Sequence, residues 1–185
     1  MLLGIDLGGT KIEGIVLKSK KNPKEIIRHR VDTEEDKGYS QVVSNIKLLV
    51  DYIENKINHK FNRLGIGTPG TIDPETGLLK NSNSQCLNGM PIQKDLSKTL
   101  DKTILIQNDA NCFALAETFL GSVKEQYPNA NNVFGIIMGT GVGGGVVIDG
   151  KTVYGNQGIG GEWGHTIVTD DGDMCYCGKR GCVES

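Results

Sequence analysis

The sequence predicts an α/β fold built from two related units, and three observations support this prediction. Short apolar runs typical of strands alternate with segments of helical periodicity. A strand, a glycine-rich turn and a second strand occur at residues 2–17 and again at 133–149. Glycine makes up 26 of the 185 residues, about twice the usual share of roughly 7%. We therefore expect a first α/β domain over residues 1–120 and the start of a second over residues 121–185.

The first domain is expected to open with a β-hairpin. Residues 2–7 are apolar with little interruption, Gly8-Gly9-Thr10 provides a turn, and residues 11–17 read as the second strand. Residues 25–31 predict a third strand. Apolar residues then recur at intervals of three and four from Tyr39 to Asn58, which predicts the clearest helix of the sequence.

The later strands of the first domain are expected to carry ligand-binding residues at their carboxyl ends. Further elements predicted for the first domain are a strand at 64–68, a short helix at 92–100, a strand at 103–107 and a helical pattern from 112 to 120. The block Asn108-Asp109-Ala110-Asn111 joins the last strand to that helix. In α/β sheets, ligands bind at the carboxyl ends of the strands. The Asn-Asp pair is therefore a candidate for contact with a ligand.

The second domain is expected to follow a boundary segment at 121–132, which is rich in asparagine and contains Pro128. A strand at 133–138, a glycine loop at 139–145 and a strand at 146–149 come next. The remaining residues are glycine-rich and poor in periodicity, so they are expected to be irregular.

The composition argues against several classes of protein. Twenty Lys and Arg residues against 22 Asp and Glu residues leave a net charge of −2, so no overall field would hold a nucleic acid or an anionic membrane. No apolar run reaches the roughly 18–20 residues that span a bilayer, and Asp6 comes too early for a signal peptide. Five cysteines, an odd number, do not suggest secreted disulfides. We expect a cytoplasmic protein with no nucleic-acid or membrane partner.

Two formal motif matches do not fit their surroundings. Residues 139–144 satisfy the G-x-G-x-x-G pattern, but a strand follows them where a dinucleotide site needs a helix. Residues 145–152 satisfy the P-loop pattern, but their interior is β-like and no helix follows. We therefore reject a dinucleotide fold and a P-loop.

The two glycine turns are instead candidates for binding phosphate. Glycine lets backbone N–H groups approach an anion closely, and Thr10 and Thr140 add hydroxyl donors. Asp6, at the edge of the first turn, is a candidate ligand of Mg²⁺, because hard cations prefer oxygen. Two ordinary glycine-rich β-turns are the alternative. The candidate residues for phosphate and magnesium are Asp6, Gly8, Gly9, Thr10, Lys11, Gly139, Thr140, Gly141 and Gly143.

A cluster of metal-ligating residues lies near the end of the sequence. The pattern His165-x9-Cys175-x-Cys177-x4-Cys182 places one imidazole and three thiols within 18 residues, which is the Cys₃His set of a closed structural zinc site. Four protein ligands leave no position for a metal-bound water. The zinc is therefore expected to hold the loop, with His165 and the neighbouring Glu162, and not to perform chemistry. Incidental free thiols are the alternative.

These motifs, taken in order, resemble one known family. The blocks that carry the resemblance are Asp6-Leu7-Gly8-Gly9-Thr10-Lys11, Gly67-Thr68-Pro69-Gly70, Asn108-Asp109-Ala110-Asn111-Cys112, Gly139-Thr140-Gly141-Val142-Gly143-Gly144-Gly145, Gly161-Glu162-Trp163-Gly164-His165 and Cys175-Tyr176-Cys177-Gly178-Lys179-Arg180-Gly181-Cys182-Val183-Glu184. They look like the ROK family of sugar kinases and sugar-responsive repressors, over essentially the whole chain. The segments 80–84 and 87–89 are most similar to fructokinase/mannokinase-type members, and N-acetylglucosamine kinase is the near competitor.

The resemblance implies an actin-like (hexokinase/Hsp70-type) ATPase fold of ribonuclease-H-like domains, with the second domain incomplete. It also implies transfer of the ATP γ-phosphate to a hexose hydroxyl, expected to be O6, with Mg²⁺ and a structural Zn²⁺ as cofactors. By position Asp109 corresponds to the catalytic base, and a carboxylate at a strand end can accept the hydroxyl proton. The residues at the family's sugar-contact positions are Gly70, Thr71, Asn83, Asn108, Asp109, Glu162, His165 and Glu184.

Several of these residues have a simpler structural interpretation. Asp109 and Asn111 are also suited to capping the helix that follows them. Asn83 is also typical of a turn, and Glu184 lies one residue from the last residue, where order is often low.

The resemblance also leaves three interpretations of the whole chain. Family members continue beyond the zinc loop with helices that complete the second domain and contact adenosine, so the sequence is interpreted as the N-terminal portion of a kinase that is a homodimer at full length. Repressors of the family carry a helix-turn-helix segment ahead of the glycine loop, for which a strand beginning at Leu2 leaves no room. A non-catalytic sugar-binding module is the third interpretation.

Overall fold

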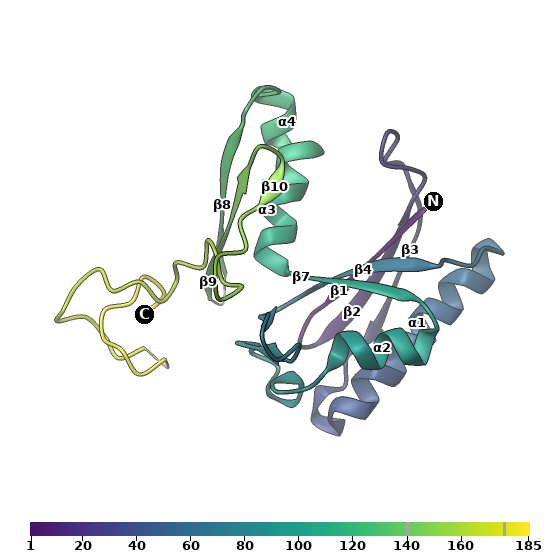
Figure 1. The fold of residues 1–185 in the computed structure, drawn as a ribbon, viewed down its shortest axis with the longest axis horizontal. Helices are drawn as coiled ribbons and strands as arrows, with labels where there is room; N and C mark the ends of the chain where they lie inside the picture. The colour runs from purple at the N-terminus through teal and green to yellow at the C-terminus, as the bar shows by residue number, and fades with distance from the viewer. Residues whose placement is uncertain (140, 176) are drawn as a thin grey trace. The chain divides into compact units, whose positions relative to one another are not determined.

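The structure is a computed structural model and describes residues 1–139, 141–175 and 177–185. Its contacts divide the chain into two compact units, Met1–Asp109 and Ala110–Ser185 (Figure 1). This division precedes the domain boundary expected after residue 120, which stays a prediction. The helix that begins at Asp109 belongs almost entirely to the second unit, because strands of that unit pack against it.

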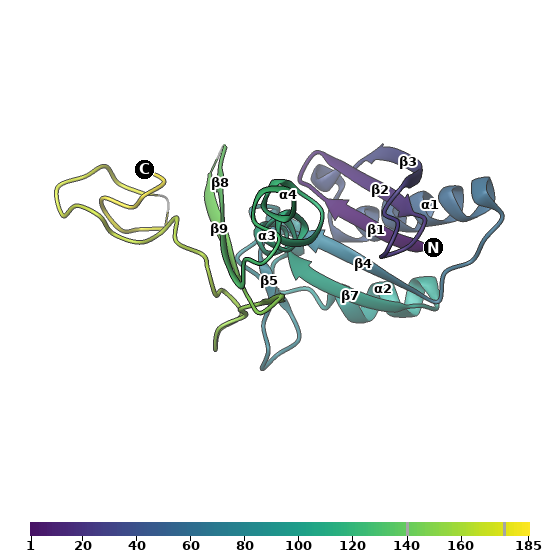
Figure 2. The same ribbon diagram turned by 90° about the horizontal axis from the view of Figure 1, so that it is seen from above.

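A five-stranded sheet forms the centre of the first unit, in the order β3-β2-β1-β4-β7. Its strands are β1 (Leu2–Leu7), β2 (Lys11–Leu17), β3 (Glu25–Asp32), β4 (Arg63–Thr68) and β7 (Thr103–Asn108). The first three strands are antiparallel, whereas β4 and β7 run parallel to β1, as their arrows show in Figure 2. The strands expected for this half of the chain are therefore confirmed, with bounds that differ by one residue at most.

Two helices cover one face of this sheet (Figure 1). Helix α1 (Tyr39–Ile57) packs against β2 and β3, and α2 (Ile92–Leu100) packs against β7 and α1. Of the apolar positions of α1 that recur at three and four residues, Val42, Ile46, Leu49, Val50 and Ile53 are buried, and those at the margins of this face are partly buried. The helix lies close to β2 at Gly14, where a Cβ atom would come within 2.5 Å of Ile53 Cδ1. Among the described helices, none combines the length and apolar character that crossing a membrane would require.

Short elements complete the first unit. They are the hairpin of β5 (Thr71–Ile72) and β6 (Leu79–Lys80) and the 3₁₀ turns η1 (Glu35–Lys37) and η2 (Gln85–Leu87). The sequence does not predict these elements, because two or three residues are too few to show a period.

The second unit contains an antiparallel sheet in the order β10-β9-β8. Its elements are α3 (Asp109–Phe119), α4 (Ser122–Gln126), β8 (Asn132–Met138), β9 (Val142–Ile148) and β10 (Lys151–Thr152). Helix α4 lies in the segment 121–132, which was expected to be the boundary between the two domains. From residue 153 onward the described residues form turns and isolated β-bridges, as the lack of periodicity predicts.

The glycine loop expected at 139–145 is shorter than predicted, because β9 already begins at Val142. Gly144 and Gly145 lie within that strand. A Cβ atom would come within 2.8 Å of Gly161 O at the first position and within 2.6 Å of Ala110 O at the second. These two glycines therefore permit close packing of backbone on backbone, and they do not form a turn.

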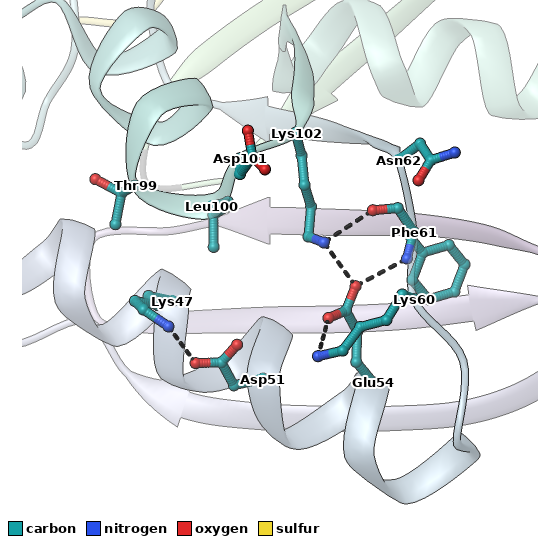
Figure 3. Close-up of a pocket in the computed structure, with 10 residues that line it drawn as sticks. All are labelled: Lys47, Asp51, Glu54, Lys60, Phe61, Asn62, Thr99, Leu100, Asp101 and Lys102. Atoms are coloured by element: carbon teal, nitrogen blue, oxygen red, sulfur yellow. Dashed lines mark hydrogen bonds and ion pairs between the residues drawn. The ribbon is translucent and has the colours of Figure 1, made fainter.

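A polar pocket lies in the first unit where β4 and β7 begin, at the edge opposite their carboxyl ends (Figure 3). Its central group is Glu54 of α1, whose side chain is 2% exposed. The carboxylate accepts hydrogen bonds from Lys60 Nζ at 2.8 Å and Phe61 N at 2.9 Å, and Lys102 Nζ lies 2.9 Å away. Lys102 Nζ also donates to Phe61 O at 2.8 Å. Because Phe61 and Lys102 lie just before β4 and β7, this network ties α1 to both strands.

We expect Glu54→Gln to destabilise the chain at pH 7. Burial by itself would raise the pKa of Glu54, but the hydrogen bonds from Lys60, Phe61 and Lys102 outweigh it and lower the pKa below its ordinary 4.5. A carboxylate whose pKa is lowered by folding stabilises the fold above its unfolded pKa and loses that effect as the pH falls. The free energy of unfolding from urea titration should fall by about 1–3 kcal/mol at pH 7, and the difference should shrink below pH 4.5.

The matched control for this variant is Asp51→Asn on the same helix. Asp51 forms an exposed ion pair with Lys47, and such pairs contribute about 1 kcal/mol or less. An equal loss of stability in both variants would contradict the central role of Glu54.

Candidate active site

The candidate catalytic residues of the first unit lie where the parallel strands end. The register pairs Asp6 of β1 with Gly67 of β4, and Thr68 of β4 with Asn108 of β7. Parallel strands carry their carboxyl ends to one edge of a sheet, which is where ligands bind in α/β folds. The expected position of the Asn-Asp pair at a strand end is therefore confirmed.

Asn108 holds the carboxylate of Asp109. The Asn108 side chain is buried, and its Nδ2 donates to Asp109 Oδ1 at 3.1 Å and to Gly70 O at 3.3 Å. Asp109 is exposed and is the first residue of α3, where a negative charge is favourable for the helix. The residue can therefore support the helix and still present a carboxylate to a ligand.

The carboxylate of Asp6 lies in a negative environment. Loss of hydration among the surrounding atoms raises its pKa most, and the charges of Asp109 and of Glu13, its register partner on β2, raise it further. Arg30 acts in the opposite direction to a smaller extent. A cation placed beside Asp6 would relieve this repulsion, which is a property expected of a magnesium ligand.

The first glycine turn is a tight hairpin connection closed by backbone hydrogen bonds. Gly8 N donates to Lys11 O at 2.9 Å, and the buried Thr33 donates its hydroxyl to Gly8 O at 2.6 Å and its amide to Thr10 O at 3.0 Å. Gly9 lies at the tip, and Thr10 is exposed. Thr33 thus fixes the turn through two hydrogen bonds, and Thr10 at its tip remains exposed.

Lys11 does not point into the turn. Its Nζ forms an ion pair with Asp32, the residue opposite it on β3. Both side chains are exposed, and exposed pairs contribute about 1 kcal/mol or less. Lys11 can therefore leave Asp32 for a phosphate at small cost.

The sugar-contact residues expected after β4 lie on a constrained loop. Gly70 has φ +81°, and a Cβ atom there would come within 2.3 Å of a backbone oxygen of β6, so only glycine fits. Thr71 is buried in β5, whereas Asn83 is exposed. Asn88 braces the residue before Asn83, because it donates to Ser82 O at 2.8 Å and accepts from Ser82 N at 2.9 Å.

The second glycine turn connects β8 and β9 in the second unit. Gly139 N donates to Gly141 O at 2.9 Å, which closes the turn. Gly143 lies within β9, opposite Ile137. Thr140, which was expected to add a hydroxyl donor, lies outside the described residues.

Both carboxylates at the expected sugar-contact positions of this unit, Glu162 and Glu184, lie near the start of β9. Glu184 is 7% exposed, and its Oε2 accepts from Val142 N at 3.2 Å. Glu162 Oε2 lies 3.8 Å from the position that a Cβ atom on Gly143 would occupy. His165 is exposed, with its Nδ1 3.9 Å from Glu184 Oε1. The structure thus brings Glu184 close both to the turn and to the imidazole.

The four expected metal ligands converge. One ligand atom from each of His165, Cys175, Cys177 and Cys182 lies within 4.8 Å of the others. His165 Nδ1 is 3.5 Å from Cys175 Sγ, and Cys177 Sγ is 3.7 Å from Cys182 Sγ. Zinc bonds of about 2.0–2.3 Å in a tetrahedron place their ligand atoms about 3.5–3.8 Å apart. The donor set and these two distances therefore fit a tetrahedral zinc ion.

Short β-bridges place the ligands of this cluster. Ile167 pairs with Cys182, and Met174 pairs with Arg180.

The amide of Lys179 lowers the pKa of the Cys177 thiol, whereas burial raises the pKa of Cys182 to about 11. A bound cation stabilises thiolates and would reverse the second effect.

Three residues support the loops of the candidate site, although the sequence did not indicate this role for them. They are Thr33, Asn88 and Trp163, and the last donates its indole N–H to Gly143 O at 3.1 Å. Asn88 and Trp163 occur within the motifs that carry the family resemblance. Thr33 had no such signal, because its role depends on the pairing of β3 with β2.

Residues 2–185 match the sequence profile of the ROK family. The chain belongs to the ROK family. Glucokinase from Thermotoga maritima is 36% identical over 186 residues, which cover 100% of this chain and 56% of the relative. N-acetyl-D-glucosamine kinase from Aliivibrio salmonicida is 35% identical over 195 residues, which cover 100% of this chain and 62% of the relative.

A solved ROK structure supports the fold. The ROK family glucokinase from Streptomyces griseus, in complex with glucose and AMPPNP, superposes with a TM-score of 0.79 at 28% identity, over 99% of this chain and 55% of that one. The chain has the actin-like ATPase fold in part, as the resemblance implied. It spans somewhat more than half the length of the ROK proteins it matches.

We expect the ROK chain, purified without chelator, to contain about one zinc ion per chain. Cys177→Ser should lower the zinc content measured by elemental analysis and lower the melting temperature, because it removes one of four ligands. Cys86→Ser is the matched control, since Cys86 lies outside the cluster. A zinc content well below one in the unmodified chain would contradict the site.

We also expect Asp109→Asn to lower the pKa of Asp6, because the substitution removes one of the negative charges that raise it. Carboxyl chemical shifts followed by NMR over a pH titration would measure this change. Asp101→Asn, at the C-terminus of α2, should leave the pKa of Asp6 unchanged. An unchanged pKa in Asp109→Asn would show that the two carboxylates do not interact.

Proposed function

We propose that the chain is part of an ATP-dependent hexose kinase in which Asp109 is the catalytic base. The observation that carries the proposal is the Asn108-Asp109 pair at the carboxyl end of β7, beside the strand ends that carry Asp6 and Gly67. The names of the two relatives support a sugar kinase, and the similar glucokinase structure is described with glucose and a nucleotide analogue.

In the proposed reaction the sugar hydroxyl attacks the γ-phosphorus of ATP. Its oxygen forms the new P–O bond, the bond from the γ-phosphorus to the bridging oxygen of ADP breaks, and the hydroxyl proton passes to Asp109. The hydrogen bond from Asn108 Nδ2 orients the Asp109 carboxylate, which accepts the proton. Asn108 also bonds to Gly70 O, which links the base to a candidate sugar loop.

The nucleotide phosphates are assigned to the two glycine turns. The tip of the first turn at Gly9 and Thr10 offers backbone donors. The second turn, which the bond from Gly139 N to Gly141 O closes, is assigned from the family resemblance. Mg²⁺ is assigned to Asp6, whose pKa is raised first by loss of hydration and then by the charges of Asp109 and Glu13, and a cation beside it would offset both effects. When bound, this ion would neutralise charge that develops on the phosphates.

The acceptor sugar is proposed to be a hexose with a free O6. The sequence predicts a fructokinase, whereas the names of the two relatives support glucose and N-acetyl-D-glucosamine. All three sugars carry a primary hydroxyl at position 6, which is less hindered than the secondary hydroxyls, so O6 is the proposed acceptor. A homodimer of a longer form stays a prediction.

A coupled ADP-release assay of the full-length protein with glucose, N-acetylglucosamine, mannose and fructose would test the function and the substrate together, and NMR of the product would locate the phosphate. We expect Asp109→Asn to lower kcat by about 10²-fold or more, because general-base groups contribute about 10²–10⁴. The Asp101→Asn control should retain the turnover of the unmodified chain. A loss of less than about tenfold in Asp109→Asn would contradict the base assignment. Sugar-dependent thermal stabilisation without ATP turnover would indicate a sugar-binding module instead.

A further inference from the structure

The buried side chain of Glu184 joins the metal cluster to the segment where β9 begins. The two oxygens of Glu184 face different groups: Oε1 lies 3.9 Å from His165 Nδ1, and Oε2 accepts from Val142 N at 3.2 Å. His165 Nδ1 is the nitrogen that faces Cys175 Sγ at 3.5 Å. The carboxylate therefore connects a candidate metal ligand with the first residue of β9.

The backbone around Glu184 fixes this connection from both sides. Glu184 N donates to Gly164 O at 3.1 Å, so the residue is anchored beside His165. A Cβ atom on Gly164 would come within 2.0 Å of Val142 O. The metal loop, which is the segment that carries His165, Cys175, Cys177 and Cys182, therefore lies closely against the start of β9. The position that a Cβ atom on Gly141 would occupy is 3.5 Å from Glu184 Oε2. The carboxylate is therefore packed against the turn itself.

A second contact joins the same two segments independently. Trp163 donates its indole N–H to Gly143 O at 3.1 Å, and its ring meets Phe134 of β8 edge to face. Trp163 lies two residues before His165. Movement of the metal loop would therefore shift contacts at both Val142 and Gly143.

We propose that Glu184 is a positioning residue through which zinc binding orders the turn between β8 and β9. With zinc held by the four ligands, His165 and Cys182 fix the ends of the paired segments on which Glu184 lies. The carboxylate then holds the Val142 amide and restricts the backbone of the turn. This role is additional to any contact of Glu184 with a sugar, and only its consequence for phosphate binding rests on the proposed function.

The proposal makes zinc and the nucleotide thermodynamically linked ligands. If zinc orders the turn and the turn binds phosphate, zinc must raise the affinity for Mg·ATP, and Mg·ATP must raise the affinity for zinc by the same factor. Without the Glu184 carboxylate, the metal loop would still bind zinc but would no longer transmit this effect.

Amide hydrogen exchange at Val142, measured by NMR on the 185-residue chain with and without added zinc, tests the link directly. We expect zinc to slow this exchange by about tenfold or more in the unmodified chain, as expected for a hydrogen bond to a charged acceptor. Glu184→Ala should bind one zinc ion but lose the slowing. Glu184→Gln keeps an oxygen acceptor and should retain part of it, and Asp170→Ala, which removes an exposed carboxylate from the same loop, should behave as the unmodified chain.

Three outcomes would overturn the proposal. They are an exchange rate at Val142 that zinc does not change, a slowing that persists in Glu184→Ala, and a loss of zinc binding in Glu184→Ala, which would make Glu184 part of the metal site itself. A separate calorimetric titration of the full-length protein with Mg·ATP should show an affinity about fivefold or more lower when zinc is absent. Absence of Mg·ATP binding in every variant would count against the proposed function, while the exchange data would still decide the role of Glu184.

Discussion

Parallel pairing of β1, β4 and β7 is the constraint on which the candidate catalytic site depends. This pairing brings the ends of three strands to one edge, and so places Asp6, Gly70 and the Asn108-Asp109 pair together although they are far apart in sequence. A slip of one residue in the register of β7 would turn Asn108 to the opposite face of the sheet and break its bond to Gly70. The helices α1 and α2, and the Glu54 network at the opposite edge, hold the strands in this register.

Glycine serves two purposes in this chain. At the turns it allows backbone donors to be exposed, but Gly144 and Gly145 show a different use, since both lie in β9 where any Cβ atom would overlap neighbouring backbone. The metal loop approaches β9 closely for the same reason. The high glycine content therefore reflects close backbone packing as much as candidate ligand binding, and it lets the segment before His165 lie directly against the start of β9.

The small net charge conceals a strongly uneven distribution. Glu13 is paired with Arg28 and Arg30, and Glu54 with Lys60 and Lys102, so these carboxylates have lowered pKa values. Asp6 has a raised pKa instead, because neighbouring atoms partly remove its hydration and because the charges of Asp109 and Glu13 repel it. Negative charge thus remains uncompensated where a magnesium ion and nucleotide phosphates are proposed to bind.

The sequence by itself determined the local elements and the chemical types at the site. The period of α1, the strand that ends at Asn108 and the spacing of the Cys₃His set were all readable, because each depends on neighbours along the chain. It did not show that Gly143 lies inside a strand, that Lys11 is paired with Asp32, or that Thr33, Asn88 and Trp163 hold the loops. Only the tertiary structure decided these points, because each results from contact between segments that are distant in sequence, and strand register and backbone packing leave no periodic trace in the residues themselves.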